Sequence, residues 1–90
     1  MDFKDWLSDI LNECVLSDLD VQRKTGINRS LIWHYKQGTK KPSFQNVGLL
    51  ADIIATTKGK KEVLSHKQIY MLRLELMFQM YQMLGGSNVD

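Results

Sequence analysis

Apolar residues near the N-terminus recur at spacings of three and four. They are Phe3, Trp6, Leu7, Ile10, Leu11 and Cys14. This spacing places them on one side of a helix, and Asp2 stands where a helix N-cap is expected. The first element is therefore predicted to be an amphipathic helix, with Trp6 and Cys14 in the core.

A capping box opens the second predicted helix. Ser17 is followed three residues later by Asp20, so each side chain can accept a hydrogen bond from the other residue's backbone N–H. Gly26 is expected to end this short helix, because glycine adopts the left-handed conformation of a helix C-terminus without strain. The inward positions of the helix are Leu19, Val21 and Thr25.

The third predicted helix is bounded by two residues that favour helix ends. Asn28 is placed to cap it, and Gly38 stands where a C-terminal stop is expected. The helix itself is predicted to run from Arg29 to about Gln37. It carries most of the polar and aromatic residues to which a function can be assigned.

A basic loop and two longer helices complete the pattern. Residues 39–42 end in a lysine before a proline, which favours extended backbone. Ser43 then caps a fourth helix, expected to end near Lys58 and Gly59. The last helix is predicted over residues 60–84, with an irregular first turn.

Two apolar stripes run along this last helix. The first steps by four and three residues through Tyr70, Leu74, Met77, Tyr81 and Leu84. The second consists of Ile69, Leu72, Leu76 and Met83. A helix that is apolar on two sides needs two partners, so one stripe is expected to cover the other helices and one to meet a second copy. The first stripe, whose stepping permits a coiled-coil-like seam, is assigned to that interface. Burial of the whole helix within one subunit is the alternative.

Charges are distributed unevenly along the ninety residues, whose net charge is +2. Residues 1–20 hold six acids and one lysine, a net charge of −5. Residues 21–67 hold ten lysines or arginines and two acids, a net charge of +8. The basic middle indicates one positive face that would attract a polyanion, with a solvated lysine-rich surface as the alternative.

The lone cysteine favours a reducing, cytoplasmic location, because Cys14 cannot form a disulfide within the chain. The first five residues are acidic rather than basic, so no signal peptide is expected. No uncharged apolar run reaches about 18 residues, and no membrane span is expected.

The segment from Ser17 to Ile54 resembles the lambda-repressor-like (XRE-type) helix-turn-helix family of Cro, phage repressors and related bacterial regulators. It has that family's order of serine cap, helix, glycine turn, recognition helix, glycine, basic loop, proline and helix. Gly26 stands at the turn, and Gly38 and Pro42 match the loop. The family's core positions correspond to Val21, Ile27, Ile32 and Tyr35.

The resemblance implies an all-α, five-helix protein whose helix-turn-helix DNA-binding domain spans residues 1–59. Residues 60–90 would then form a long C-terminal dimerisation helix and a tail. Three positions depart from the family pattern. They are Gln22, which replaces a small residue, Asp18, which replaces a phosphate-contacting glutamine, and Lys36, which replaces an acid. Lys36 is predicted to pair with Asp9, Glu13 or Asp18.

By the resemblance, the helix that begins at Arg29 lies in the major groove of DNA. Ile32 and Tyr35 mark its inward side at about 100° per residue. Base reading is assigned to Arg29, Ser30, Trp33, His34 and Gln37. Contact of Arg29 with phosphate alone, and packing of Trp33 on another subunit or on the last helix, are the alternatives.

Phosphate contacts are assigned to residues around this helix that suit anions. They are Asn28, Thr39, Lys40, Lys41 and Ser43, with the cations Arg23 and Lys24 of the second helix. The alternative for Arg23 and Lys24 is that they only keep the surface soluble.

The predicted function is that of a sequence-specific regulator of transcription that binds double-stranded DNA. A homodimer or tetramer would bind a palindromic operator with half-sites about one helical turn apart. A protein-interaction module on the same fold, such as an antitoxin or anti-repressor partner, is the alternative that Asp18 and the acidic first helix favour. No catalytic site, metal or cofactor is expected, because no nucleophile–base pair, glycine-rich phosphate loop or zinc-ligand spacing occurs.

Overall fold

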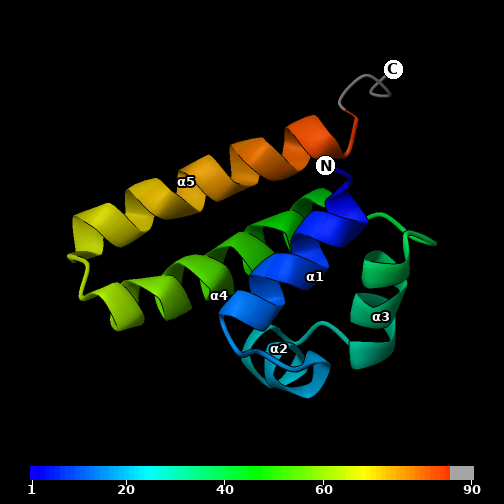
Figure 1. Cartoon of the computed structure of the whole chain (residues 1–90), viewed down its shortest axis with the longest axis horizontal. Coiled ribbons are helices and arrows are strands. Elements are labelled where there is room, and N and C mark those ends of the chain that lie inside the picture. The colour runs from blue at the N-terminus through cyan, green and yellow to red at the C-terminus, as the bar shows by residue number, and fades with distance from the viewer. Residues whose placement is uncertain (86–90) are drawn as a thin grey trace.

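Five α-helices make up the part of the chain that the computed structural model describes, residues 1–85, and no strand occurs in that part. The predicted all-α class is therefore confirmed. The helices are α1 (Phe3–Glu13), α2 (Asp18–Thr25), α3 (Arg29–Gln37), α4 (Phe44–Glu62) and α5 (His66–Met83) (Figure 1). No helix within residues 1–85 combines the length and the apolar character that crossing a bilayer requires.

The capping box at the start of α2 is present as predicted. Ser17 Oγ accepts from the backbone N–H of Asp20 at 3.0 Å, and Asp20 Oδ2 accepts from that of Ser17 at 2.9 Å. The bonds from Ser17 lower the pKa of Asp20 below its ordinary value of 3.8. The stabilisation of the fold by the ionised Asp20 carboxylate is thus complete above pH 3.8, and it is lost as the pH falls through the lowered pKa. Asp2 does not cap α1 in this way, because its carboxylate accepts from Lys4 Nζ instead (3.2 Å).

One hydrophobic core joins all five helices. Its fully enclosed side chains include Leu7, Val21, Ile32, Leu50, Ile54 and Met80. Cys14 is buried as predicted, and the burial raises the pKa of its thiol. Trp6 is only half-buried and packs at the edge of the core, 6.1 Å from Phe3 between ring centroids.

The boundary between α4 and α5 differs from the prediction. α4 continues through Gly59 to Glu62, and α5 begins at His66 rather than at residue 60. Gly59 is not a stop but a buried site of close approach, where an added Cβ would overlap the side chain of Ile69. The turn comes at Val63, whose φ of 56° is left-handed, and a capping box between Ser65 and Gln68 opens α5.

Replacing Gly59 with alanine is expected to destabilise the fold, because its methyl group would collide with Ile69. Gly48 lies in the same helix, and the nearest atom to a Cβ added there is a guanidinium nitrogen of Arg73 at 3.9 Å. Both substitutions gain the same helix propensity, so their difference isolates the overlap. Gly59→Ala should unfold with about 1–3 kcal/mol less free energy than Gly48→Ala in urea titrations. Equal stability of the two variants would contradict the close packing of α4 on α5.

Candidate nucleic-acid interface

One side of α3 is buried, as the sequence pattern predicts. Ile32 and Tyr35 point into the core and are almost fully enclosed. The hydroxyl of Tyr35 accepts a hydrogen bond from Asn46 Nδ2 of α4 at 2.8 Å. This bond ties α3 to the first turn of α4, and apolar packing holds α3 against α1 and α2.

Two side chains cap the N-terminus of α3. Asn28 Oδ1 accepts from the N–H of Ser30 at 2.8 Å, and Gln22 Oε1 of α2 accepts from the N–H of Arg29 at 2.7 Å. Gln22, one of the departures from the family pattern, thus reaches across the turn and ties α2 to α3. The backbone N–H groups of Arg29 and Ser30 already donate to these caps, and Asn28 Oδ1 already accepts. The side-chain group of Asn28 that can contact a phosphate is therefore Nδ2.

An ion pair joins the C-terminal half of α3 to the start of α2. Lys36 Nζ donates to Asp18 Oδ1 at 2.7 Å, and about a quarter of each side chain is exposed (25% and 26%). The predicted pairing of Lys36 with an acid is therefore confirmed, and its partner is Asp18. The pair also offsets the negative charge of Asp18, which stands where the family has a phosphate-contacting glutamine.

The contribution of this pair is measurable by a double-mutant cycle. Lys36→Met and Asp18→Asn should each lower the free energy of unfolding. The double variant should be about 1 kcal/mol more stable than the sum of the two losses predicts. Urea unfolding of the four proteins gives the coupling energy. Lys40→Met, a change on the exposed loop, should fall within about 0.5 kcal/mol of the parent. A coupling energy of zero would mean that the pair does not position α3.

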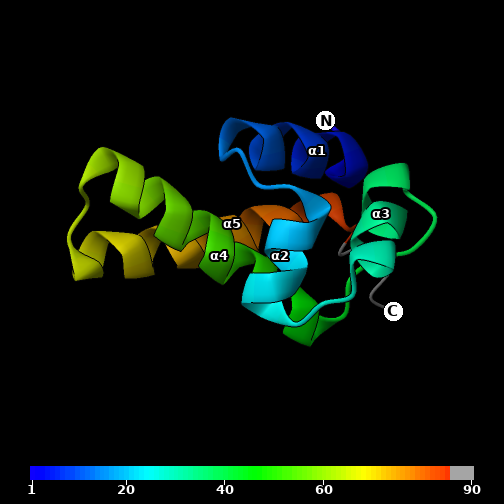
Figure 2. The same cartoon turned by 90° about the horizontal axis from the view of Figure 1, so that it is seen from below.

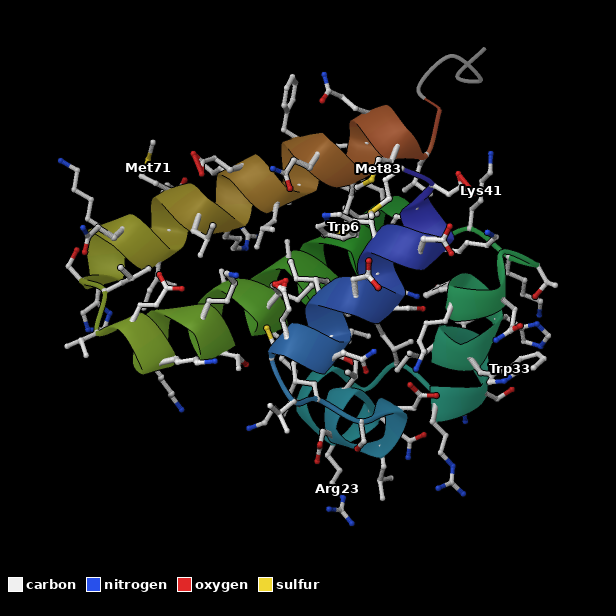
Figure 3. The ribbon with its side chains drawn as sticks, viewed as in Figure 1. Trp6, Arg23, Trp33, Lys41, Met71 and Met83 are labelled. Carbon is white, nitrogen blue, oxygen red and sulfur yellow. The ribbon has the colours of Figure 1, made fainter. Side chains whose placement is uncertain are left out.

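The outward side of α3 is open. Arg29, Ser30 and Gln37 are exposed, and half of the Trp33 side chain is accessible (50%). Figure 3 shows Trp33 projecting from α3 away from the other helices. Its ring meets the ring of His34 edge-on, with centroids 5.1 Å apart. Packing of Trp33 on the last helix is therefore not observed.

His34 is less free than the other residues assigned to base reading. It is half-buried, and its Nδ1 lies 2.6 Å from Thr39 Oγ1 in the following loop. The Thr39 hydroxyl also donates to the backbone oxygen of His34 at 3.3 Å. Thr39 thus holds the Nδ1 edge of the ring, and Nε2 is the ring nitrogen left for a base edge.

The cations assigned to phosphate contacts are not all gathered around α3. In Figure 3, Trp33 lies between Arg23 at the end of α2 and Lys41 beside the C-terminal end of α5. Lys41 Nζ donates to the backbone oxygen of Leu84 at 3.5 Å, and Lys40 is exposed in the same loop. Lys24, in contrast, lines a hollow between α2 and α4.

The cations of the basic middle lie in two parts of the molecule and not only around α3. Arg23, Arg29, Lys40 and Lys41 lie on α2, on α3 and in the loop that follows. Four lysines lie instead around the α4–α5 turn, at the end of the 36 Å long axis that is away from α3 (Figure 1). They are Lys58, Lys60, Lys61 and Lys67. The α-helical geometry of α4 carries its last three lysines away from α3.

The two stripes of α5 are divided between the core and the solvent. Leu76 of the second stripe is buried, and the other members of that stripe pack against the core. Met80, which belongs to neither stripe, is also buried. Of the stripe assigned to the partner, Tyr70 and Leu74 are exposed. Three further members, Met77, Tyr81 and Leu84, are half-buried against the core.

The sequence-based assignment missed three exposed apolar residues beside this stripe. They are Met71 and Phe78 on α5 and Phe44 at the start of α4. Phe44 stacks on Tyr81, with ring centroids 5.7 Å apart and planes 17° apart. Burial raises the pKa of the Tyr81 hydroxyl. We call the surface of Phe44, Tyr70, Met71, Leu74 and Phe78 the outer apolar face.

No group of three or more His, Cys, Asp or Glu side chains within residues 1–85 is placed to hold a metal ion.

Comparison of the chain with known proteins gives no relative. No family model matches the chain, and neither a curated protein nor a solved structure matches it. The lambda-repressor-like family therefore stays a proposal, supported by the motif residues and by the contacts that hold α3.

Proposed function

We propose that this chain is a sequence-specific, double-stranded-DNA-binding regulator of transcription of the Cro and phage-repressor type. The observation that carries the proposal is that α3 is held firmly on one side and exposed on the other. This helix is capped at its N-terminus by Gln22 and Asn28, tied to α2 by Asp18 and Lys36, and exposed on its outer side. A short helix that is fixed on one side and open on the other suits insertion into the major groove.

The exposed side chains of α3 have the chemistry of base readers. The guanidinium of Arg29 can donate two hydrogen bonds to guanine, and the amide of Gln37 can pair with adenine. Trp33 presents apolar surface to a thymine methyl group. Ser30 and the free Nε2 of His34 add weaker, single contacts.

The surroundings of α3 supply phosphate contacts. Arg23, Lys40 and Lys41 flank the helix, and Thr39 and Asn28 add polar groups. Ser43 opens α4, whose N-terminus attracts anions. Lys24 contributes only through its field, because it lines the hollow beside α4. With about five phosphates neutralised, log affinity should fall with log salt at a slope near −4.5.

The proposal includes a homodimer, or a tetramer built from it, joined through the outer apolar face. Phe44 and Phe78 are among its most exposed members (75% and 64%). Contiguous exposed apolar surface of this kind marks interaction sites in proteins. Two-fold pairing would present two copies of α3 to an approximately palindromic operator. A cytoplasmic location, which the lone buried cysteine favours, is also part of the proposal.

Selection of bound sequences from random duplexes, followed by anisotropy titrations at two salt concentrations, tests the function. The proposal requires an enriched motif with two half-sites and an affinity that weakens as salt is raised. The alternative is a protein-interaction module, which the exposed acids Asp5, Asp9 and Glu13 of α1 favour. Failure to enrich any motif, together with binding that does not respond to salt, would decide for that alternative.

A further inference from the structure

A hollow of about 640 Å³ lies between α2 and α4, on a part of the surface that the proposed DNA contacts do not use. Figure 2 shows α2 lying across α4 there. Its apolar lining comes from Leu16, Leu49 and Ile53. Lys24 lines it from α2, and Lys60 and Lys61 line it from the last turn of α4. The apolar lining is thus accompanied by three lysines from two helices.

We propose that this hollow binds a small amphipathic anion, a carboxylate or phosphate carried on an apolar body. Its volume lies within the range of about 300–1,000 Å³ that small-molecule sites occupy. Such sites combine an apolar lining with a few polar groups that fix orientation. The lysine stems extend the apolar lining, and their ammonium groups meet the head group at its rim.

Charge complementarity selects an anion over a neutral amphiphile. Asp52 is the acid that lines the hollow, and its Oδ1 lies 3.9 Å from Arg73 Nε of α5. Arg73 offsets part of that negative charge. The three lysines then leave the hollow positive.

α2 is shared between the hollow and the contacts that hold α3. Lys24 and Thr25 line the hollow, whereas Asp18 and Gln22 of the same helix bind Lys36 and the N–H of Arg29. A bound ligand therefore touches the helix that positions the proposed recognition helix. Binding of the anion in the hollow does not depend on whether the chain binds DNA.

The test is a titration of the ¹⁵N-labelled whole chain with decanoate below its micelle concentration, without DNA. Decanoate should shift the amide resonances of Leu16, Thr25, Ile53 and Thr57 with saturation. Decan-1-ol, which has the same chain without charge, should bind at least about tenfold more weakly. Decyl phosphate, in a third titration, shows which of the two head groups binds more tightly at the same residues.

Matched variants distinguish binding in the hollow from nonspecific binding elsewhere on the protein surface. Lys24→Gln with Lys60→Gln should weaken decanoate binding about tenfold, the combined effect of two surface charge contacts. Lys67→Gln, which also removes a positive charge near the α4–α5 turn, should leave it unchanged. Shifts confined to Tyr70, Leu74 and Phe78, equal binding of decan-1-ol, or no shifts at all would each overturn the proposal. Since no DNA is present, these outcomes are independent of whether the chain binds DNA.

Discussion

Leu74→Glu and Phe78→Glu should each convert the proposed dimer into a folded monomer. Both residues lie on the outer apolar face of α5, on the side opposite the buried Leu76 and Met80. A carboxylate placed in a dry interface loses its hydration, at a cost of about 2 kcal/mol for each copy. Two copies meet across a two-fold axis, so the Kd of the dimer should rise about a thousandfold.

Sedimentation equilibrium measures this change, and circular dichroism checks that helical content is retained. Gln79→Glu is the matched control, because it adds the same charge to an exposed position of α5 outside the outer apolar face. The control should sediment like the parent. If Leu74→Glu and Phe78→Glu also sediment like the parent, the outer apolar face is not the interface.

The sequence predicts the helices before residue 44 closely because their ends have local causes. Ser17, Asn28 and Ser43 bond to the first turns of their helices, and Gly26 and Gly38 take left-handed backbone (φ 83° and 81°). Each of these effects acts within a few residues, so each can be recognised in the local amino-acid sequence.

The end of α4 was not predictable in this way. A glycine late in a helical pattern has the same appearance in the sequence whether it ends the helix or admits a neighbouring side chain. Only the packing of Ile69 from α5 shows that Gly59 serves the second purpose. The actual stop at Val63 has no local signal, because valine disfavours the left-handed conformation it adopts there.

In the candidate site too, some features were predictable from the local sequence and others depend on contacts between distant segments. The inward and outward sides of α3 follow from helical periodicity, and Ile32 and Tyr35 are buried as that predicts. The roles of Gln22 and Thr39 depend on contacts across turns, which periodicity does not encode. The division of the basic residues into two groups likewise follows from the length and direction of α4. Phe78, four residues after Leu74, could have been found from the helical spacing alone.

Two kinds of substitution should separate specificity from affinity. Arg29→Ala should cost about 1–3 kcal/mol at the selected operator and relax the preference at one base pair. The Arg29 side chain is exposed, and its backbone N–H keeps the bond to Gln22, so the fold should remain intact. Lys40→Ala with Lys41→Ala should weaken binding to all duplexes about equally and reduce the salt slope by about 2.

Lys60→Ala with Lys61→Ala supplies the matched control for the second change. It removes the same two charges, but from the α4–α5 end of the long axis. Anisotropy titrations on operator and scrambled duplexes should leave this variant close to the parent, because charges beyond about 10 Å are screened at moderate salt. Equal losses for the two double variants would mean that net charge, rather than contact around α3, drives binding. The recognition helix would then have no role in affinity, and α3 would have to be reassigned to a protein partner.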